Sequence, residues 1–136
     1  MKAEFNGRGT GLYHLLLVCI GGAVGAGMRH LMMIAAGRLL GIAFPWGTLA
    51  VNVLGSFAMG LLVEALARRF AVSTEIRLLL ATGLLGGFTT FSSFSLDAAV
   101  LWERGALAAA MGYVGASVAC SILALFGGLW VVRSIL

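Results

Sequence analysis

The stretch GLLGGFTTFSSFS, residues 83–95, is the part of the sequence that is most informative about the fold. Glycine, threonine and serine have low helix propensity, and they make up most of this stretch, which lies inside a long apolar segment. The combination predicts a membrane helix that is interrupted part-way along its length. An interruption at membrane depth is tolerated where the freed carbonyls and amides find partners in protein, water or ions. We therefore expect the break to face such partners rather than lipid.

Around this stretch the composition is that of a membrane protein. The chain has 136 residues, of which 61% are apolar and 10% charged, and its mean hydropathy is +1.06. A soluble domain usually carries about a quarter of charged residues to cover its surface. The composition therefore excludes an ordinary soluble domain and a disordered chain. It predicts a polytopic membrane protein.

Four segments have the roughly 20 mainly apolar residues that a spanning helix needs. The connections between them are too short to form domains. The sequence therefore predicts an all-α integral membrane protein, an up-down unit of four transmembrane helices with both termini on one side. Residues 1–11 are polar and glycine-rich and are expected to form a mobile tail, ahead of a single four-helix membrane domain of residues 12–136. The expected spans are Leu12–Ala36, Gly47–Leu66, Leu78–Leu101 and Ala106–Val132.

Small residues recur at four-residue spacing in three of these spans. Such pairs let helix backbones approach closely, either within one bundle or between two copies. Because four helices of this composition enclose little by themselves, we expect a homo-oligomer. The pairs are Gly21/Gly25, Gly83/Gly87 and Gly112/Ala116.

The charged residues indicate whether the chain binds nucleic acid and how it is oriented in the membrane. The net charge is +4, but the basic residues flank the spans and form no patch with exposed aromatics, so no nucleic acid partner is expected. The end that holds both termini carries six basic residues against two at the other end, which favours termini inside. Without the tail this bias is weak, and the orientation stays open. The six are Lys2, Arg8, Arg68, Arg69, Arg77 and Arg133, and the two are Arg38 and Arg104.

Polar side chains form two stripes at the spacing i, i+4 and i+8. This spacing places side chains on one face of a helix, so two stripes on separate helices predict the wall of a polar path. Hydrogen bonding between helices is the alternative for any single hydroxyl. Hydroxyl and amide donors suit an anion at least as well as a cation. The stripes are Thr48, Asn52 and Ser56 in the second span and Tyr113, Ser117 and Ser121 in the fourth.

Charged and aromatic residues inside the spans indicate which kind of ion the polar path conducts. Glu64 and Asp97 lie near the ends of their spans, so no carboxylate is expected at the bilayer midplane, where cation transporters and proton-coupled pumps usually need one. Arg29 lies within the first span, where it either snorkels to the interface or attracts an anion into an aqueous vestibule. In the interrupted span, freed carbonyls suit a small cation. The positive ring edges of Phe91 and Phe94 suit an anion, although packing is the ordinary use of such residues.

Together these residues resemble the Fluc/CrcB family of small bacterial fluoride channels. Three stretches carry the resemblance in the family's order, and the last of them is long and highly specific. The resemblance covers nearly the whole chain. The stretches are GGAVGA at residues 21–26 with Arg29, GTLAVN at 47–52 with GSF at 55–57, and GLLGGFTTFSSFS at 83–95.

The resemblance implies a passive, fluoride-selective channel that exports cytoplasmic fluoride, limits its toxicity and is not an enzyme. It implies a dual-topology antiparallel homodimer in the bacterial inner membrane, with a broken third helix, two pores and a structural sodium ion (Na+) at the interface. Fluoride, membrane lipid and a second copy are the implied partners. The excess of basic residues at one end is larger than dual topology expects. The implied residues are Asn52, Phe91, Phe94, Thr48, Tyr113, Ser117 and Ser121 along the pore, Arg29 at the vestibule, and the backbone carbonyls of Gly86 and Thr89 on sodium.

Three other classes of protein compete with this interpretation. A small multidrug transporter, also a four-span dimer, works through a glutamate in its first span, and this first span contains no acid. A scaffold subunit would use the polar stripes for helix packing alone, so replacing Phe91 or Asn52 would change stability but no flux. An intramembrane enzyme lacks a credible base, because His14 and His30 are expected at the interface.

Overall fold

The computed structural model of the chain describes residues 2–68 and 73–135, with side chains from residue 10 onwards. Within these ranges the chain is all-helical, as its composition predicts. Arg69 and the side chains of Lys2 and Arg8, which entered the count of basic residues, lie outside the described part.

The described residues form four segments that are long and apolar enough to cross a membrane. Three are single helices, and the third crossing is made of four shorter pieces. These crossings coincide with the four expected spans and extend a few residues beyond them. The bounds are α1 Lys2–Leu40, α2 Trp46–Arg68, α3 Thr74–Arg77, the π-helix η1 Leu78–Leu85, α4 Gly86–Phe88, α5 Phe91–Glu103 and α6 Leu107–Ile135.

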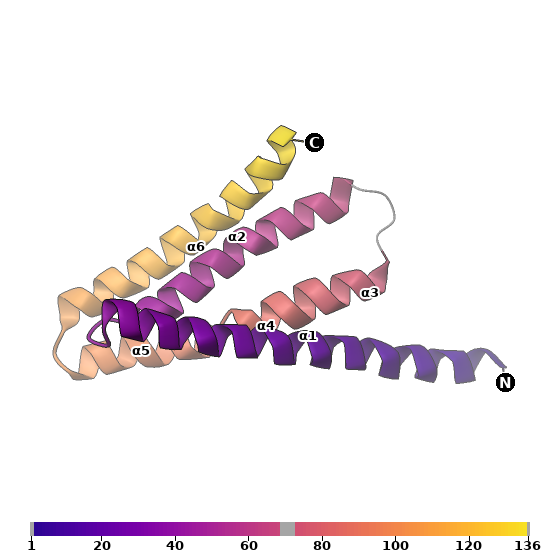
Figure 1. Ribbon diagram of the computed structural model, residues 1–136, viewed down its shortest axis with the longest axis horizontal. Helices are drawn as coiled ribbons and strands as arrows, with labels where there is room; N and C mark the ends of the chain where they lie inside the picture. Colours follow the sequence, from indigo (N-terminus) through magenta and orange to yellow (C-terminus); the bar gives the residue numbers. More distant parts are fainter. Residues whose placement is uncertain (1, 69–72, 136) are drawn as a thin grey trace.

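The crossings pack as two pairs (Figure 1). α2 lies along α6, and α1 lies along η1 and α4. Both termini point toward the end of the bundle where α2 finishes and α3 begins, which confirms that they lie on one side. Helix α1 is continuous from Lys2. That residues 1–11 are a mobile tail ahead of a membrane domain of residues 12–136 stays a prediction.

Two short connections contain glycine at positive φ. α1 is followed by Gly41, with φ of 81°, whose N–H donates to the carbonyl of Gly37 at 3.1 Å. α5 and α6 are joined through Gly105, with φ of 76°. Residues other than glycine rarely adopt this left-handed conformation. Each turn reverses the chain within a few residues, so the crossings that it joins run in opposite directions.

Glycines bring α1 against the third crossing at backbone distance. A Cβ at Gly25 would meet the carbonyl oxygen of Leu84 and would lie 2.8 Å from the amide nitrogen of Phe88. A Cβ at Gly83 would lie 3.0 Å from Cα of Gly21. The two crossings therefore touch backbone to backbone, as the small-residue pairs in these spans predict.

The small-residue pair in the fourth span, Gly112/Ala116, does not make such a backbone contact. The Cβ position of Gly112 has no atom within 4 Å, and Ala116 is half-buried. This face of the first half of α6 is not used for close packing within the described residues of the chain, whereas Tyr113 and Ser117, on the other side of the helix, are buried. The unused face is free for another molecule.

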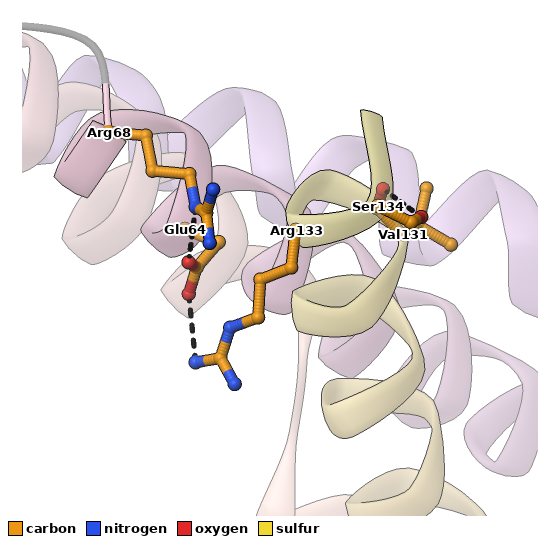
Figure 2. Close-up of polar contacts among 5 residues, drawn as sticks. All are labelled: Glu64, Arg68, Val131, Arg133 and Ser134. Atoms are coloured by element: carbon orange, nitrogen blue, oxygen red, sulfur yellow. Dashed lines mark hydrogen bonds and ion pairs between the residues drawn. The ribbon is translucent and has the colours of Figure 1, made fainter. Parts of the chain in front are cut away.

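A charged cluster ties the ends of α2 and α6 together (Figure 2). Glu64 accepts a hydrogen bond from Nε of Arg68 at 2.7 Å and another from Nη2 of Arg133, on α6, at 3.0 Å. Exposed ion pairs add little to stability. The two helices are held mainly by their close packing, in which a Cβ at Gly60 would meet the carbonyl oxygen of Leu125. The cluster instead holds two guanidinium groups on one carboxylate at this end of the bundle.

The glycine contact predicts a difference between two neighbouring substitutions on α1. Gly25→Ala should lower the melting temperature of the detergent-solubilised protein, because the new methyl group forces two backbones apart at a cost of about 1–3 kcal/mol. Gly27→Ala is the matched control, since nothing lies within 4 Å of that position and alanine favours a helix over glycine by about 1 kcal/mol. A Gly25→Ala variant as stable as Gly27→Ala would contradict the backbone contact.

Candidate functional site

The third crossing breaks at Thr89 and Thr90, which confirms the predicted interruption. Both residues have extended backbone, with φ and ψ of −75° and 158° for Thr89 and of −153° and 118° for Thr90. The residues ahead of α4, Leu78–Leu85, wind as the wider π-helix, a rare form that is frequent at functional sites. The low helix propensity of residues 83–95 therefore produces one localised break.

Asn52, on α2, closes the break with two hydrogen bonds. The N–H of Thr90 donates to Oδ1 of Asn52 at 2.8 Å, and Nδ2 of Asn52 donates to the carbonyl of Thr90 at 2.9 Å. An unsatisfied buried backbone group costs about 1–3 kcal/mol. A single side-chain amide therefore makes the interruption tolerable at membrane depth. The second N–H of the same amide remains for another acceptor.

The same arrangement frees two carbonyl oxygens. In a continuous helix Gly86 would accept from the N–H of Thr90, but this group donates to Asn52. Thr89 would accept from the N–H of Ser93, but this group donates to Oγ1 of Thr90 at 3.1 Å. The carbonyls of Gly86 and Thr89 thus lose their ordinary helical donors. They are the two oxygens that the family resemblance implies as sodium ligands.

A cavity of about 340 Å³ lies beside the break. Its wall comes from the middle of α2, the break with the start of α5, and the middle of α6. None of the residues that line it is charged. The sequence-predicted site residues that line it are Asn52, Thr89, Phe91, Phe94, Ser117 and Ser121.

Two hydroxyls of α6 in this wall have no protein partner. Oγ of Ser117 and Oγ of Ser121 are buried and make no hydrogen bond within the described part of the chain. A buried hydroxyl in this state is unfavourable by about 1–3 kcal/mol, unless water or an ion completes it. The two serines are one helical turn apart, about 6 Å along the axis. They offer two successive donors along the cavity.

Tyr113 and Thr48 lie behind the cavity wall. They are 0% and 2% exposed, and neither lines the cavity. The phenol of Tyr113 donates to Oδ2 of Asp97 at 3.2 Å, with Thr48 and Ser117 beside it. The polar stripe of α6 therefore divides into two parts. The hydroxyl of Tyr113 donates to a carboxylate, whereas the hydroxyls of Ser117 and Ser121 make no hydrogen bond with the described residues.

Asp97 contacts this site through Tyr113, a contact that sequence reasoning did not single out. It lies near the end of its crossing, as the sequence predicts, since α5 ends at Glu103. A signal is present in the sequence, because Asp97 comes three residues after Phe94 and shares its face of the helix. A carboxylate beside the stripe makes this end of the arrangement less favourable for an anion than the uncharged cavity.

Aromatic rings link the cavity to the connection between α1 and α2. The ring centroids of Phe91 and Phe94 are 5.3 Å apart, and those of Phe94 and Tyr113 are 5.5 Å apart. Phe44, which the sequence did not single out, meets Tyr113 edge-on at 5.6 Å and 89°. At the other end, Phe91 is 78% exposed on the single chain. The site therefore reaches the surface of the single chain.

Two further predicted site residues, besides Thr48 and Tyr113, lie outside the cavity. Arg29 is half-buried on α1, does not line the cavity, and makes no hydrogen bond or ion pair with the described residues. Gly86 is exposed and does not line it either. The vestibule role of Arg29 stays a prediction.

Comparison with known proteins covers all four crossings. A family model described as CrcB-like protein, Camphor Resistance (CrcB), matches residues 16–129. The chain belongs to the CrcB family. It is therefore a multi-pass membrane protein, and its family consists of ion channels rather than enzymes.

Several CrcB relatives carry the name fluoride-specific ion channel FluC. The relative from Chelativorans sp. (strain BNC1) is 79% identical over 125 residues, which is 92% of this chain and 100% of the relative. The relative from Mesorhizobium japonicum is 59% identical over 124 residues, 91% of this chain and 99% of the relative. That from Agrobacterium fabrum is 55% identical over 124 residues, with the same coverage.

The bonds to Thr90 predict how this CrcB chain responds to a change at Asn52. Asn52→Leu is similar in size but leaves two backbone groups without partners, at about 1–3 kcal/mol for each group. The melting temperature should fall, and the Thr90 amide should exchange its hydrogen faster. Ser56→Ala, one turn along the same wall of the cavity, is the matched control. Equal exchange at Thr90 in the two variants would show that something else holds the break.

Proposed function

We propose that the chain is a fluoride-selective passive channel that exports fluoride from the bacterial cytoplasm and so limits its toxicity. The observation that carries this proposal is the uncharged cavity beside the break, where the buried hydroxyls of Ser117 and Ser121 have no partner in the described part of the chain. The name that the relatives share, fluoride-specific ion channel, supports the same cargo.

The cavity has the chemistry that a fluoride path needs. Fluoride is small and strongly hydrated, so a selective path must replace its water with several close donors. Ser117 and Ser121 supply hydroxyls, Asn52 supplies an N–H, and Phe91 and Phe94 supply ring edges. None of these groups has a full positive charge, which would hold the anion too strongly for passage. Donors of moderate strength at successive positions let the ion move from one to the next.

Beyond the cavity, Thr48 and Tyr113 continue the proposed route. Because Tyr113 donates its hydrogen to Asp97, it has no hydrogen to offer to an anion. A passing anion then depends on the hydroxyls of Thr48 and Ser117 for donors at this level. Arg29, on α1, is proposed to attract anions into the vestibule.

A second copy completes the proposed channel. Phe91 is largely exposed beside the cavity, and the positions of Gly112 and Ala116 leave a face of α6 open. An antiparallel, dual-topology homodimer would cover such surfaces and hold two symmetric pores. The basic residues at the end that holds Arg68 and Arg133 favour one orientation, so the subunit interface has to outweigh this bias.

The break fits a structural sodium ion at the dimer interface. The carbonyls of Gly86 and Thr89 lack their helical donors, and small hard cations prefer oxygen ligands. Within the described ranges no group of three His, Cys, Asp or Glu side chains converges, so these carbonyls are the groups that would hold the ion. Two copies related by a twofold axis would supply four such oxygens. A bound sodium would hold the two breaks together.

The acid chemistry of hydrogen fluoride explains the use of a passive channel. Neutral hydrogen fluoride crosses bilayers and ionises in a less acidic cytoplasm, which traps the anion there. A selective path in the inner membrane lets the anion leave under the membrane potential. No nucleotide or coupled ion is required.

Passive efflux from liposomes tests the cargo and the path. Liposomes with purified protein in sodium buffer should release fluoride, read with a fluoride electrode, and retain chloride. Ser121→Ala should slow the release by about tenfold or more, since a hydrogen bond to a charged partner contributes about 1.5–3 kcal/mol. Cys120→Ala, at the exposed neighbouring position of α6, should not slow it.

Each outcome of this efflux assay tests a different part of the proposal. No release from folded wild-type protein would refute the channel. Unchanged release in Ser121→Ala would remove this serine from the path. A slower release at an unchanged melting temperature separates a channel from a scaffold subunit, for which only stability would change.

Replacement of sodium tests the proposed cation site. Exchange for the large cation N-methylglucamine should reduce fluoride release and loosen the dimer, as read by efflux and by size-exclusion chromatography. Thr89→Val keeps the backbone carbonyl and should keep the dependence on sodium. Equal release and equal dimer in both salts would rule out the site at Gly86 and Thr89.

A further inference from the structure

The charged cluster at the end of α2 and α6 has hydrogen-bonding capacity that the protein does not use (Figure 2). Within the described residues, Arg68 binds Glu64 through Nε and Arg133 binds it through Nη2. A guanidinium has five N–H donors, so both arginines keep most of their donors free. Two cations on one carboxylate also leave one positive charge uncompensated.

The cluster lies at the level of lipid headgroups. α2 runs for 23 residues, from Trp46 to Arg68, which is about 34 Å at the ordinary helical rise. The hydrocarbon core of a bilayer is about 30 Å thick. Arg68 at the end of this helix therefore reaches the interface, and Arg133 is bound to the same carboxylate there.

An exposed apolar stripe on α6 leads to the cluster. Leu123, Phe126 and Trp130, the α6 stripe, are 69%, 60% and 68% exposed. Together with Arg133 they stand at i, i+3, i+7 and i+10, on one face of the helix. This face presents apolar side chains over about 10 Å and ends in a guanidinium. A phospholipid has the same order, with acyl chains followed by a phosphate.

We propose that Arg68 and Arg133, held together by Glu64, bind the phosphate of an anionic phospholipid whose acyl chain lies along the α6 stripe. Guanidinium groups match the geometry of phosphate oxygens, with parallel N–H donors. The uncompensated positive charge favours an anionic headgroup such as phosphatidylglycerol. A zwitterionic headgroup brings a cation of its own, which the arginines repel. The inference holds whichever ion the chain conducts.

Trp130 reports on this lipid directly. In a Trp46→Phe/Trp102→Phe background it is the single tryptophan of the chain. The full-length protein is placed in phosphatidylcholine bilayers with a minor fraction of brominated phosphatidylglycerol or, in the matched arm, of brominated phosphatidylcholine. Bromine quenches tryptophan fluorescence at short range. Brominated phosphatidylglycerol should quench as though enriched about fivefold, because the cluster has one uncompensated positive charge. Equal quenching in the two arms would overturn the proposal.

Variants test whether the lipid preference comes from this site or from the overall positive charge of the protein. Arg68→Gln/Arg133→Gln should abolish the preference, whereas Arg104→Gln, at the opposite end next to α5, should leave it intact. Glu64→Gln releases donors of both arginines and should strengthen the preference. A preference that survives the double variant, or that weakens in folded Glu64→Gln protein, would contradict the site. If the double variant does not fold, the result for Glu64→Gln decides.

Discussion

The structure depends on one pair of hydrogen bonds, those between the side chain of Asn52 and the backbone of Thr90. Hydrocarbon offers no water to replace a lost helical partner, so the third crossing can break where a side chain takes over both backbone groups. With the N–H of Thr90 so engaged, the carbonyl of Gly86 loses its donor. Thr90 then caps the new helix through the N–H of Ser93, which frees the carbonyl of Thr89. The cavity, with the exposed Phe91 and the half-buried Phe94 at the start of α5, follows from this pair of hydrogen bonds.

Residue type and spacing predict much of the fold, because each such feature is local. The four crossings follow from runs of apolar residues, and the break follows from the weak helix formers between residues 83 and 95. The partner of Thr90 does not follow in this way, since Asn52 is 38 residues away in the sequence. Periodicity places Asn52 on a face of α2. It does not say which element packs against that face.

Periodicity does not reveal the neighbour of a helix face, and this also explains the differences within the predicted site. Tyr113, Ser117 and Ser121 have identical spacing and look equivalent in the sequence. In the structure, Tyr113 donates to Asp97 while the two serines have no partner among the residues that the structure describes. Their roles are set by a neighbour on α5, which no pattern within α6 reveals. Arg29 illustrates the converse, because the sequence marks it as a charge in a span and the fold places it away from the cavity.

The order of the helices along the chain has a consequence for how the protein is made. α2 packs chiefly against α6, which leaves the ribosome after α1 to α5. Until then, the face of α2 around Gly60 that packs against α6 is open to lipid. The amide of Asn52 likewise has no backbone partner until α5 has begun. The helices α1 to α5 are thus synthesised before the helix that covers α2 is in place. A ribosome that stops before α6 leaves α2 without its main packing partner.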